Sequence, residues 1–233
     1  MVNLVSYRFD APVATIAMDD GKVNALSLDL LGQLDTAFDR AQADGAVVVL
    51  TGRTGIFSGG FDLGVLRAGG PDATAMLGAG FDLARRILSF PLPVVVACTG
   101  HAVAMGVFLL LSGDHRVGAD GPFRITANEV AIGLTMPHAA VEICRQRLAP
   151  APFNRAVVLA EVFGPRDAAA AGFLDEVVAA DDVAQVARAR AEAAALLDLD
   201  AHAATKQRAR RHTLDALQVA LDADRADFAS ASA

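Results

Sequence analysis

The residue best suited to move a proton is Glu129, which lies in a mostly apolar segment, residues 126–134. Burial disfavours the ionised form of a carboxylate, so its pKa is expected to rise. An acid that titrates near neutral pH can both take up and return a proton. The same pattern fits a carboxylate that lies at a strand edge or caps the next helix. Periodicity alone does not separate these interpretations.

Two glycine-rich turns could supply the complementary chemistry, a site for a negatively charged oxygen. One is FSGGFDL, residues 57–63, and the other lies in TGHAVAMGVFLLLSG, residues 99–113, after the apolar run Val94–Cys98. The second turn is predicted to open into an apolar helix near Ala104. The first N–H groups of a helix have no intrahelical acceptor and favour negative charge. Two such turns could direct two N–H donors at one carbonyl oxygen.

Other common kinds of site find no support in the sequence. The five histidines never fall in an HxxxH or HExxH pattern, so no metal site is predicted. Ser58 lacks the GxSxG frame of a nucleophilic serine. Gly78 and Gly80 lie inside a helical pattern, which is the wrong context for a dinucleotide-binding turn.

Several charged residues have simpler structural interpretations. His138 follows Pro137 at a predicted helix start and is interpreted as structural, and Glu142 one turn later fits a solvated or ion-paired face. Asp62 is predicted to cap the helix after the first glycine turn. The basic cluster of Lys206, Arg208, Arg210 and Arg211 is predicted to be a solvated helix face, with a phosphate contact as the alternative.

The composition sets limits on partners and location. The chain has 233 residues, 54% of them hydrophobic, a net charge of −7, no Trp and one Tyr. This acidic balance disfavours nucleic-acid binding. Cys98 and Cys144 are expected to be buried free thiols. No secretory signal is evident, and the longest apolar run is shorter than the roughly 20 residues that span a bilayer. We therefore expect a soluble, cytoplasmic protein that binds no membrane.

Strand and helix patterns alternate along most of the chain. A hairpin is predicted over residues 2–18, then a helix Leu28–Ala43 with Ser27 as its N-cap, and a buried strand from Val47. Further helices are predicted over 71–88, 136–148, 152–163 and 165–172, a strand over 173–178, and helical structure over 181–228. The alternation predicts an α/β core with parallel strands. The strand–loop–helix unit at Val47 recurs at Val94, which hints at a repeat.

Taken in order, these segments resemble the crotonase superfamily, the enoyl-CoA hydratase/isomerase family. The resemblance covers nearly the whole chain. Its motifs are residues 23–26 (VNAL), 57–63 (FSGGFDL), 100–106 (GHAVAMG), 128–134 (NEVAIGL) with Pro137, and 172–178 (GFLDEVV). Each motif alone is a weak signal, whereas their order and spacing together are specific.

The resemblance implies a crotonase-like α/β spiral of β-β-α repeats over residues 1–178. A C-terminal helical region, 179–233, belongs to the same structural unit and serves trimerisation. The expected substrate is an acyl-coenzyme A thioester, without a separate cofactor because coenzyme A is part of the substrate. The expected assembly is a homotrimer or a dimer of trimers. The family's two oxyanion donors would be the backbone N–H groups of Phe61 and Met105. Residues expected near substrate or coenzyme are Lys22, Asn24, Ala25, Gly60, Asp62, Gly106 and Phe108.

One departure from the family pattern bears on the reaction. The family's hydratases use two glutamates, of which one corresponds to Glu129 and the other to the position of Phe108. A phenyl ring has no proton to exchange, so the resemblance favours proton transfer between two carbons, as in an isomerase. Hydration stays open if His138 or Glu142 supplies the second acid, and a noncatalytic acyl-CoA-binding protein is a further alternative. Lys22, Arg67 or Lys206 would have to meet the coenzyme phosphates.

Overall fold

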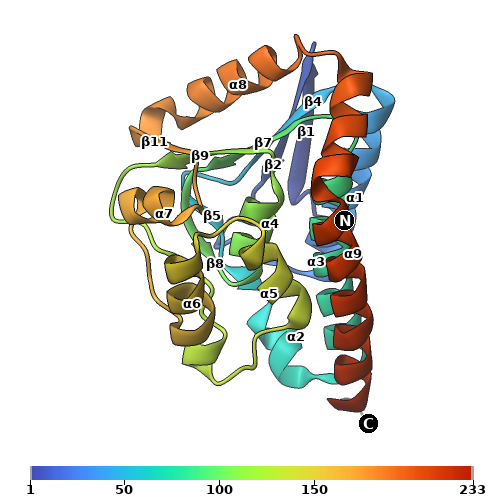
Figure 1. Ribbon diagram of the computed structural model, residues 1–233, viewed down its shortest axis with the longest axis vertical. Coiled ribbons are helices and arrows are strands. Elements are labelled where there is room, and N and C mark those ends of the chain that lie inside the picture. The colour runs from blue at the N-terminus through green and yellow to red at the C-terminus, as the bar shows by residue number, and fades with distance from the viewer. Residues whose placement is uncertain (1, 232–233) are drawn as a thin grey trace.

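A mixed sheet of six strands forms the frame of the molecule (Figure 1). The computed structural model describes residues 2–231, and the side chains of residues 2–228. The strand order is β1-β2-β4-β7-β9-β11; β1 and β2 form the antiparallel hairpin predicted, and the remaining neighbours are parallel. Their bounds are β1 Val5–Asp10, β2 Val13–Met18, β4 Val47–Thr51, β7 Val94–Cys98, β9 His115–Ala119 and β11 Glu176–Val178.

Smaller sheets extend three of these strands into a repeated unit. The second sheet has the order β10-β8-β5, with β5 Gly55–Ser58, β8 Gly100–Val103 and β10 Ile125–Thr126. Each of its strands directly follows a strand of the first sheet, which gives the pairs β4–β5, β7–β8 and β9–β10. Successive pairs lie side by side, because their strands are neighbours in both sheets. The recurrence predicted between Val47 and Val94 is confirmed, because these residues begin adjacent strands. A third sheet pairs β3 Ala25–Leu26 with β6 Gly60–Phe61.

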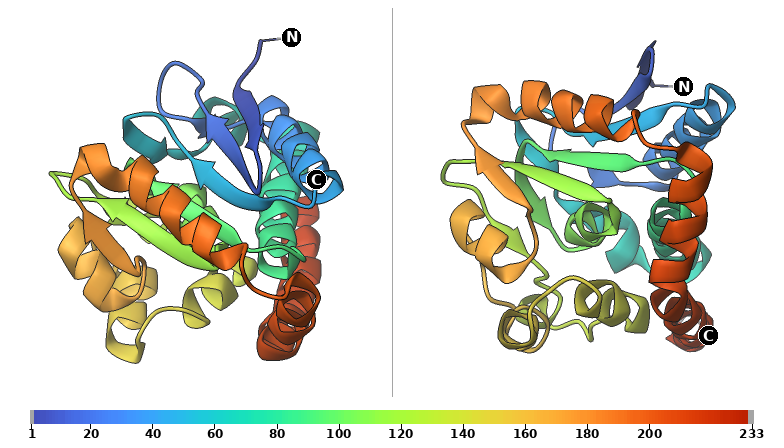
Figure 2. Two further views of the ribbon diagram at one scale, coloured as in Figure 1. Left: turned by 90° about the horizontal axis from the view of Figure 1, so that it is seen from above. Right: turned by 45° about the horizontal axis from the view of Figure 1, so that its top comes forward.

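Both faces of the large sheet are covered, which explains its nearly continuous apolar strands. Along β4 and β7 successive side chains alternate between two separate clusters: Val48 and Val96 belong to the main core, whereas Val49 and Val95 pack in a second core with α8 Val183–Ala194. In Figure 2, α8 crosses one face of the sheet and the other helices lie on the opposite side or beyond its end.

The remaining helices surround the end of the sheet where the glycine-rich turns lie. They are α1 Leu28–Ala43, α2 Leu63–Ala68, α3 Gly70–Ser89, α4 Met105–Ser112, α5 His138–Arg145, α6 Pro150–Leu159, α7 Pro165–Ala171 and α9 Leu199–Ala231. Short 3-10 turns occur at Val130–Ile132 (η1) and Ala180–Asp182 (η2). The helix α9 runs along α3 and α5 on one side of the molecule (Figure 1).

Local predictions for these elements were mostly correct. Ser27 caps α1 by accepting a hydrogen bond from the Leu30 N–H, and Asp62 caps α2. The predicted helix 152–163 is wrong in its bounds: α6 ends where Ala160 takes a left-handed conformation, and Phe163 instead bonds Ile125 across a β-bridge. The predicted strand 173–178 begins only at Glu176.

Other sequence expectations can be compared with the described residues. Cys98 and Cys144 are buried free thiols, as predicted, and burial raises the pKa of Cys98 to about 12. Within residues 2–231, no helix has the length and apolar character needed to cross a membrane. The same residues bring together no cluster of three or more metal-ligating side chains.

Candidate active site

An apolar cavity of about 440 Å³ lies between α2, α3, the start of α4 and the segment around η1. The C-terminal helix α9 closes part of its wall. The cavity is lined by Gly59, Phe61, Leu63, Leu66, Gly69, Gly70, Ala73, Thr74, Leu77, Phe81, Val103, Ala104, Phe108, Asn128, Glu129, Ile132, Leu134, Thr135, Pro137 and Phe228. Within this described lining, Glu129 is the one side chain that titrates near neutral pH.

The Glu129 carboxyl group is placed by the end of β10 and the turn that follows. Its backbone carbonyl accepts hydrogen bonds from the N–H groups of Ile132 at 3.1 Å and Leu134 at 2.9 Å, which hold the chain as it turns away from β10. The residue is only 7% exposed, and its Oε2 is buried without a hydrogen-bond partner among the described residues. Burial raises its pKa to about 7, against a weaker opposing effect from a backbone hydrogen bond. This carboxyl group can therefore accept or donate a proton near neutral pH.

The two glycine turns touch each other beside this cavity, and two glycines make the contact close. A Cβ at Gly60 would lie 2.9 Å from the Ala104 Cβ and 3.4 Å from the Met105 nitrogen. A Cβ at Gly106 would lie 2.6 Å from the Ser58 carbonyl oxygen. Gly60 also has φ +90°, which disfavours any other residue. Substitution at either glycine would force the two turns apart.

The predicted donor residues lie at this contact. Met105 is the first residue of α4, where Ala104 provides no side-chain cap, so its N–H has no acceptor within the helix. Phe61 ends β6 immediately before Asp62 caps α2. The structure thus brings both segments to the cavity that holds Glu129. The role of these two N–H groups as an oxyanion hole stays a prediction.

Aromatic rings form one wall of the cavity. Phe108 is 1% exposed and stacks on Phe81 with ring centroids 6.0 Å apart, and Phe81 meets Phe61 edge to face at 6.2 Å. Gly80 lies behind this row, because a Cβ there would come within 2.5 Å of the Phe61 ring. Phe108, which stands at the position expected to hold the second glutamate of the hydratases, is therefore a packed aromatic ring.

Lys22, Asn24 and Ala25 lie beside the first glycine turn. Asn24 is fully buried and donates to the carbonyl oxygens of Met18 and Phe57, both at 3.1 Å, while Ala25 pairs with Gly60 between β3 and β6. Asn24 therefore fixes this segment by hydrogen bonds to backbone. Lys22 is exposed next to Arg53, which donates to its carbonyl at 3.0 Å.

His138 and Glu142, the alternative second acids, do not line the cavity. The His138 side chain is 61% exposed and its Nε2 lies 3.6 Å from Asp227 on α9. Glu142 is half-buried on α5 and is ion-paired with Arg145 at 3.2 Å. Neither side chain is therefore among the described residues that line the cavity with Glu129.

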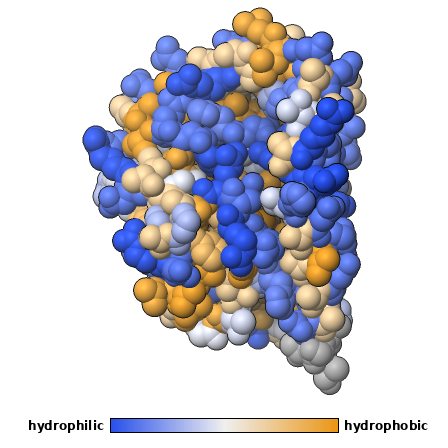
Figure 3. Space-filling view, viewed as in Figure 1, coloured by the Kyte–Doolittle hydropathy of each residue, from blue (hydrophilic) through white to orange (hydrophobic). Residues whose placement is uncertain are grey.

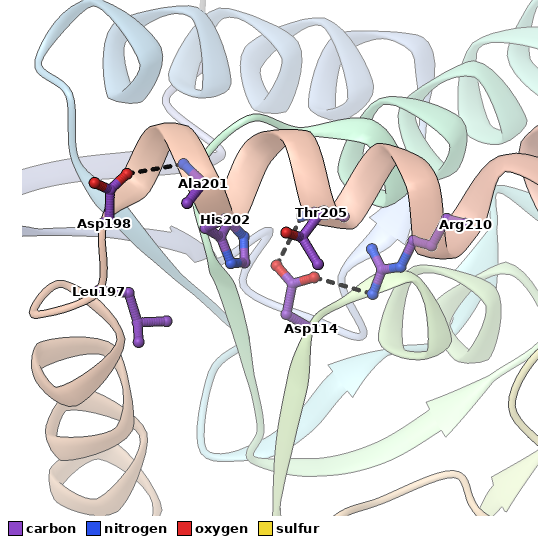
Figure 4. Close-up of a pocket in the computed structure, with 8 residues that line it drawn as sticks. Asp114, Leu197, Asp198, Ala201, His202, Thr205 and Arg210 are labelled. Carbon is purple, nitrogen blue, oxygen red and sulfur yellow. Dashed lines mark hydrogen bonds and ion pairs between the residues drawn. The ribbon is translucent and has the colours of Figure 1, made fainter.

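A second cavity, about 480 Å³, lies away from Glu129 between Asp114 and the first turns of α9 (Figure 4). Here the prediction of a solvated basic face is wrong for two residues. Lys206 is 6% exposed and its Nζ lies 2.7 Å from Asp114, while Arg210 lies 2.9 Å from the other oxygen of the same carboxylate. Lys206 is therefore unavailable for coenzyme phosphates.

Sequence reasoning did not single out most of the cavity residues, and Asn128 and Phe228 are two of those it missed. Asn128 precedes Glu129, and its buried Oδ1 has no hydrogen-bond partner among the described residues. Phe228 reaches the cavity from α9, nearly 100 residues further along the chain. A signal did exist for Phe228, because it is the one aromatic residue in the sequence of that helix.

The glycine turns and the layered sheets together define a protein of the crotonase fold. The enoyl-CoA hydratase/isomerase family model matches residues 8–233, and the chain belongs to this family of enzymes.

The names of its relatives include both enoyl-CoA isomerases and enoyl-CoA hydratases. Mouse mitochondrial enoyl-CoA delta isomerase 1 is 30% identical over 97% of this chain and 80% of its own length. A probable enoyl-CoA hydratase, echA17, from Mycobacterium avium is 31% identical over 77% of this chain and 71% of its own. One protein from Mycobacterium tuberculosis is named an enoyl-CoA isomerase in one solved structure and a probable enoyl-CoA hydratase in another. The first of these structures is 47% identical, with a TM-score of 0.94, and the match covers 98% of this chain and 100% of its own.

Proposed function

We propose that this enzyme isomerises 3-enoyl-CoA to 2-enoyl-CoA thioesters, with Glu129 as the single proton carrier. Ionised Glu129 takes a proton from C2 of the substrate, and the electron pair of that C–H bond moves into a dienolate. The same carboxylic acid then returns the proton at C4, so that the double bond ends between C2 and C3. Atoms and charge balance without a second acid, a metal or a separate cofactor.

The observation that carries this proposal is the lone titratable group in the described lining of an apolar cavity. Hydration has to activate a water molecule and protonate C2, a task that two carboxylates divide. Here Phe108 packs in the second position, and His138 and Glu142 lie outside the cavity. A pKa of about 7 at Glu129 suits a group that must first accept a proton and then give it back.

The negative charge that develops on the thioester oxygen is assigned to the N–H groups of Phe61 and Met105. A helix start offers such a donor without the need to reorganise, and the apolar surroundings strengthen the interaction. The contact between Gly60 and the start of α4 keeps the two donor segments together. Gly106 serves the same purpose from the other side, against Ser58.

The coenzyme end of the substrate is assigned to the segment of Lys22, Asn24 and Ala25. This segment lies against the first glycine turn, and Lys22 and Arg53 are the cations beside it. Arg67, which is exposed on α2 next to the cavity residue Leu66, is assigned as a further phosphate contact.

The test is Glu129→Gln, assayed with 3-octenoyl-CoA for isomerisation and 2-octenoyl-CoA for hydration. Loss of a general base is expected to lower kcat/KM for isomerisation about 10²–10⁴-fold. Glu142→Gln is the matched control, with a glutamate removed outside the cavity, and it is expected to retain wild-type activity. Unchanged isomerisation in Glu129→Gln would eliminate the proposed role.

Two further outcomes separate the alternatives. Rapid formation of 3-hydroxyoctanoyl-CoA by the wild-type protein would overturn the preference for isomerisation. Tight binding of acyl-CoA in calorimetry without turnover of either substrate would identify a noncatalytic acyl-CoA-binding protein.

We also propose a homotrimer or a dimer of trimers. An apolar surface patch on α6 and the adjoining η1 supports this assembly, and it lies at the lower left in Figure 3. Within it, Leu159 is 71% exposed, Val158 57% and Val130 45%. Surface patches of this kind mark protein contacts. Sedimentation equilibrium is expected to give three or six copies; a monomer would contradict this proposal.

A further inference from the structure

The second half of α9 is held to the cavity wall by a buried cap. Asp224 is 3% exposed, and its two carboxylate oxygens accept hydrogen bonds from the backbone N–H groups of His138 and Ala139, both at 2.8 Å. These are the first two residues of α5, and Pro137 before them provides no side-chain cap. A residue more than 80 positions away thus performs the capping that a local side chain usually performs.

Phe228 follows Asp224 by four residues, one helical turn, so both side chains lie on the same face of α9. Phe228 lines the cavity together with Thr135 and Pro137, the residues that lead into α5. The hydrogen bonds of Asp224 therefore join the N-terminus of α5, beside the cavity, to the turn of α9 that carries Phe228. A shift of α9 away from α5 would move this ring out of the wall.

An exposed ion pair attaches the same turn of α9 to α3, and it is expected to contribute less to stability than the buried cap. Arg225 pairs with Asp82 of α3 at 2.9 Å, and both side chains are 49% exposed. Exposed ion pairs contribute little, whereas a buried carboxylate bonded to two N–H groups is costly to remove. The two interactions form a matched pair for experiment, since both tie the same turn of α9 to the cavity walls.

We propose that Phe228 limits the acyl-chain length that the cavity accepts, and that Asp224 is the positioning residue that holds it there. This inference rests on the proposed function for the class of ligand, an acyl-CoA thioester. It gives the C-terminal helix a part in substrate selection: the ring occupies space that a longer chain would otherwise fill.

The experiment compares calorimetric affinities for butyryl-, octanoyl- and dodecanoyl-CoA, which are saturated and bind without turnover. Phe228→Ala is expected to raise the preference for dodecanoyl- over butyryl-CoA about tenfold, because about two additional methylene groups become buried. Asp224→Ala is expected to change that preference in the same direction by a smaller factor. The double variant is expected to match Phe228→Ala alone, because Asp224 acts through the ring.

Asp82→Ala is the control, and it is expected to leave the chain-length preference unchanged. If Asp224→Ala does not fold, Asp224→Ser, which retains one acceptor, serves in its place. An unchanged preference in Phe228→Ala would overturn the assignment of the ring. A lower Tm in the Asp224 variant without a changed preference would overturn the positioning role.

The outcomes also separate this inference from the proposed function. A wild-type protein that binds these thioesters with the expected preferences but does not isomerise 3-octenoyl-CoA would overturn isomerisation and leave the inference standing. A wild-type protein that binds none of the three thioesters would overturn both.

Discussion

Glu129 and Asp114 each line a cavity, and the two cavities have similar volumes. The two carboxylates differ in their surroundings, because within the part of the chain that the structure describes one has cationic partners and the other does not. Asp114 lies between the cationic groups of Lys206 and Arg210, and it also accepts a hydrogen bond from the Val94 N–H at 2.7 Å. Glu129 faces an apolar cavity, and one of its oxygens has no partner among the described residues. Cavity size therefore does not identify the site of chemistry here. The contrast supports the proposal that Glu129 exchanges its proton with a substrate, because one of its oxygens has no fixed partner among the described residues.

The largest effect on folding is expected from removing the compensated carboxylate. Asp114→Ala leaves Lys206 and Arg210 buried without their shared anion, and breaking a buried ion pair from one side costs about 3–5 kcal/mol. For a chain of this size, the expected fall in Tm is roughly 6–20 °C. Urea or thermal unfolding measures it.

Glu192→Ala provides the contrast for Asp114→Ala, since it removes an exposed ion pair with Arg188 at 2.8 Å. It is expected to change stability by less than about 1 kcal/mol. Equal losses of stability in the two variants would show that burial of the ion pairs of Asp114 has no energetic consequence. The contrast drawn between Asp114 and Glu129 would then lose its basis.

The contrast between the two acids also shows what the sequence could predict. Apolar neighbours within a few positions offered burial of Glu129 as one of two interpretations, and the structure shows that it is buried; local spacing identified Ser27 and Asp62 as helix caps. These features depend on residues that are close in the chain. Phe108 could be recognised as a departure only through the family resemblance.

The interactions that sequence patterns missed join residues far apart in the chain. Lys206 is on a helix rich in charge, which is typical of a solvated face, but its partner Asp114 lies 92 residues away. The cap from Asp224 to His138 spans 86 residues. Helical periodicity gives the face on which such residues lie, but not the element that packs against it.

The second prediction concerns the pH dependence of kcat/KM for isomerisation. If Glu129 must be ionised to accept the C2 proton, a pKa of about 7 means that kcat/KM falls about tenfold for each pH unit below this value. Between pH 7 and pH 5 the expected loss is about 50-fold, because half of the carboxyl groups are already protonated at pH 7. An ordinary glutamate would lose activity only below about pH 4.5. The profile should be measured with 3-octenoyl-CoA, and a flat profile between pH 5 and 7 would contradict the assignment.

The smallest expected effect is a gain in stability on removing the uncompensated acid. Burial raises the pKa of Glu129 from 4.5 to about 7, so the folded state holds this proton more tightly than the unfolded state does. Stability is then lost as the pH rises from about 4.5 to 7, and the full penalty persists above pH 7. Glu129→Gln cannot ionise and avoids this penalty. The variant is expected to be more stable than wild type by about 1–3 kcal/mol at pH 8, a range that allows for the imperfect hydrogen bonding of a buried amide.

The pH dependence of this gain separates it from a simple packing effect. Near pH 4 the glutamic acid is protonated in both states, so the difference between Glu129→Gln and wild type should vanish, whereas better packing would persist at every pH. Glu142→Gln makes the same chemical change at a half-buried, ion-paired glutamate of α5, and it is expected to show no gain at pH 8. If Glu129→Gln were destabilised at pH 8, the acid would have to be compensated by contacts like those of Asp114. The two carboxylates would then be alike, and the physical reason for locating the chemistry at Glu129 would be lost.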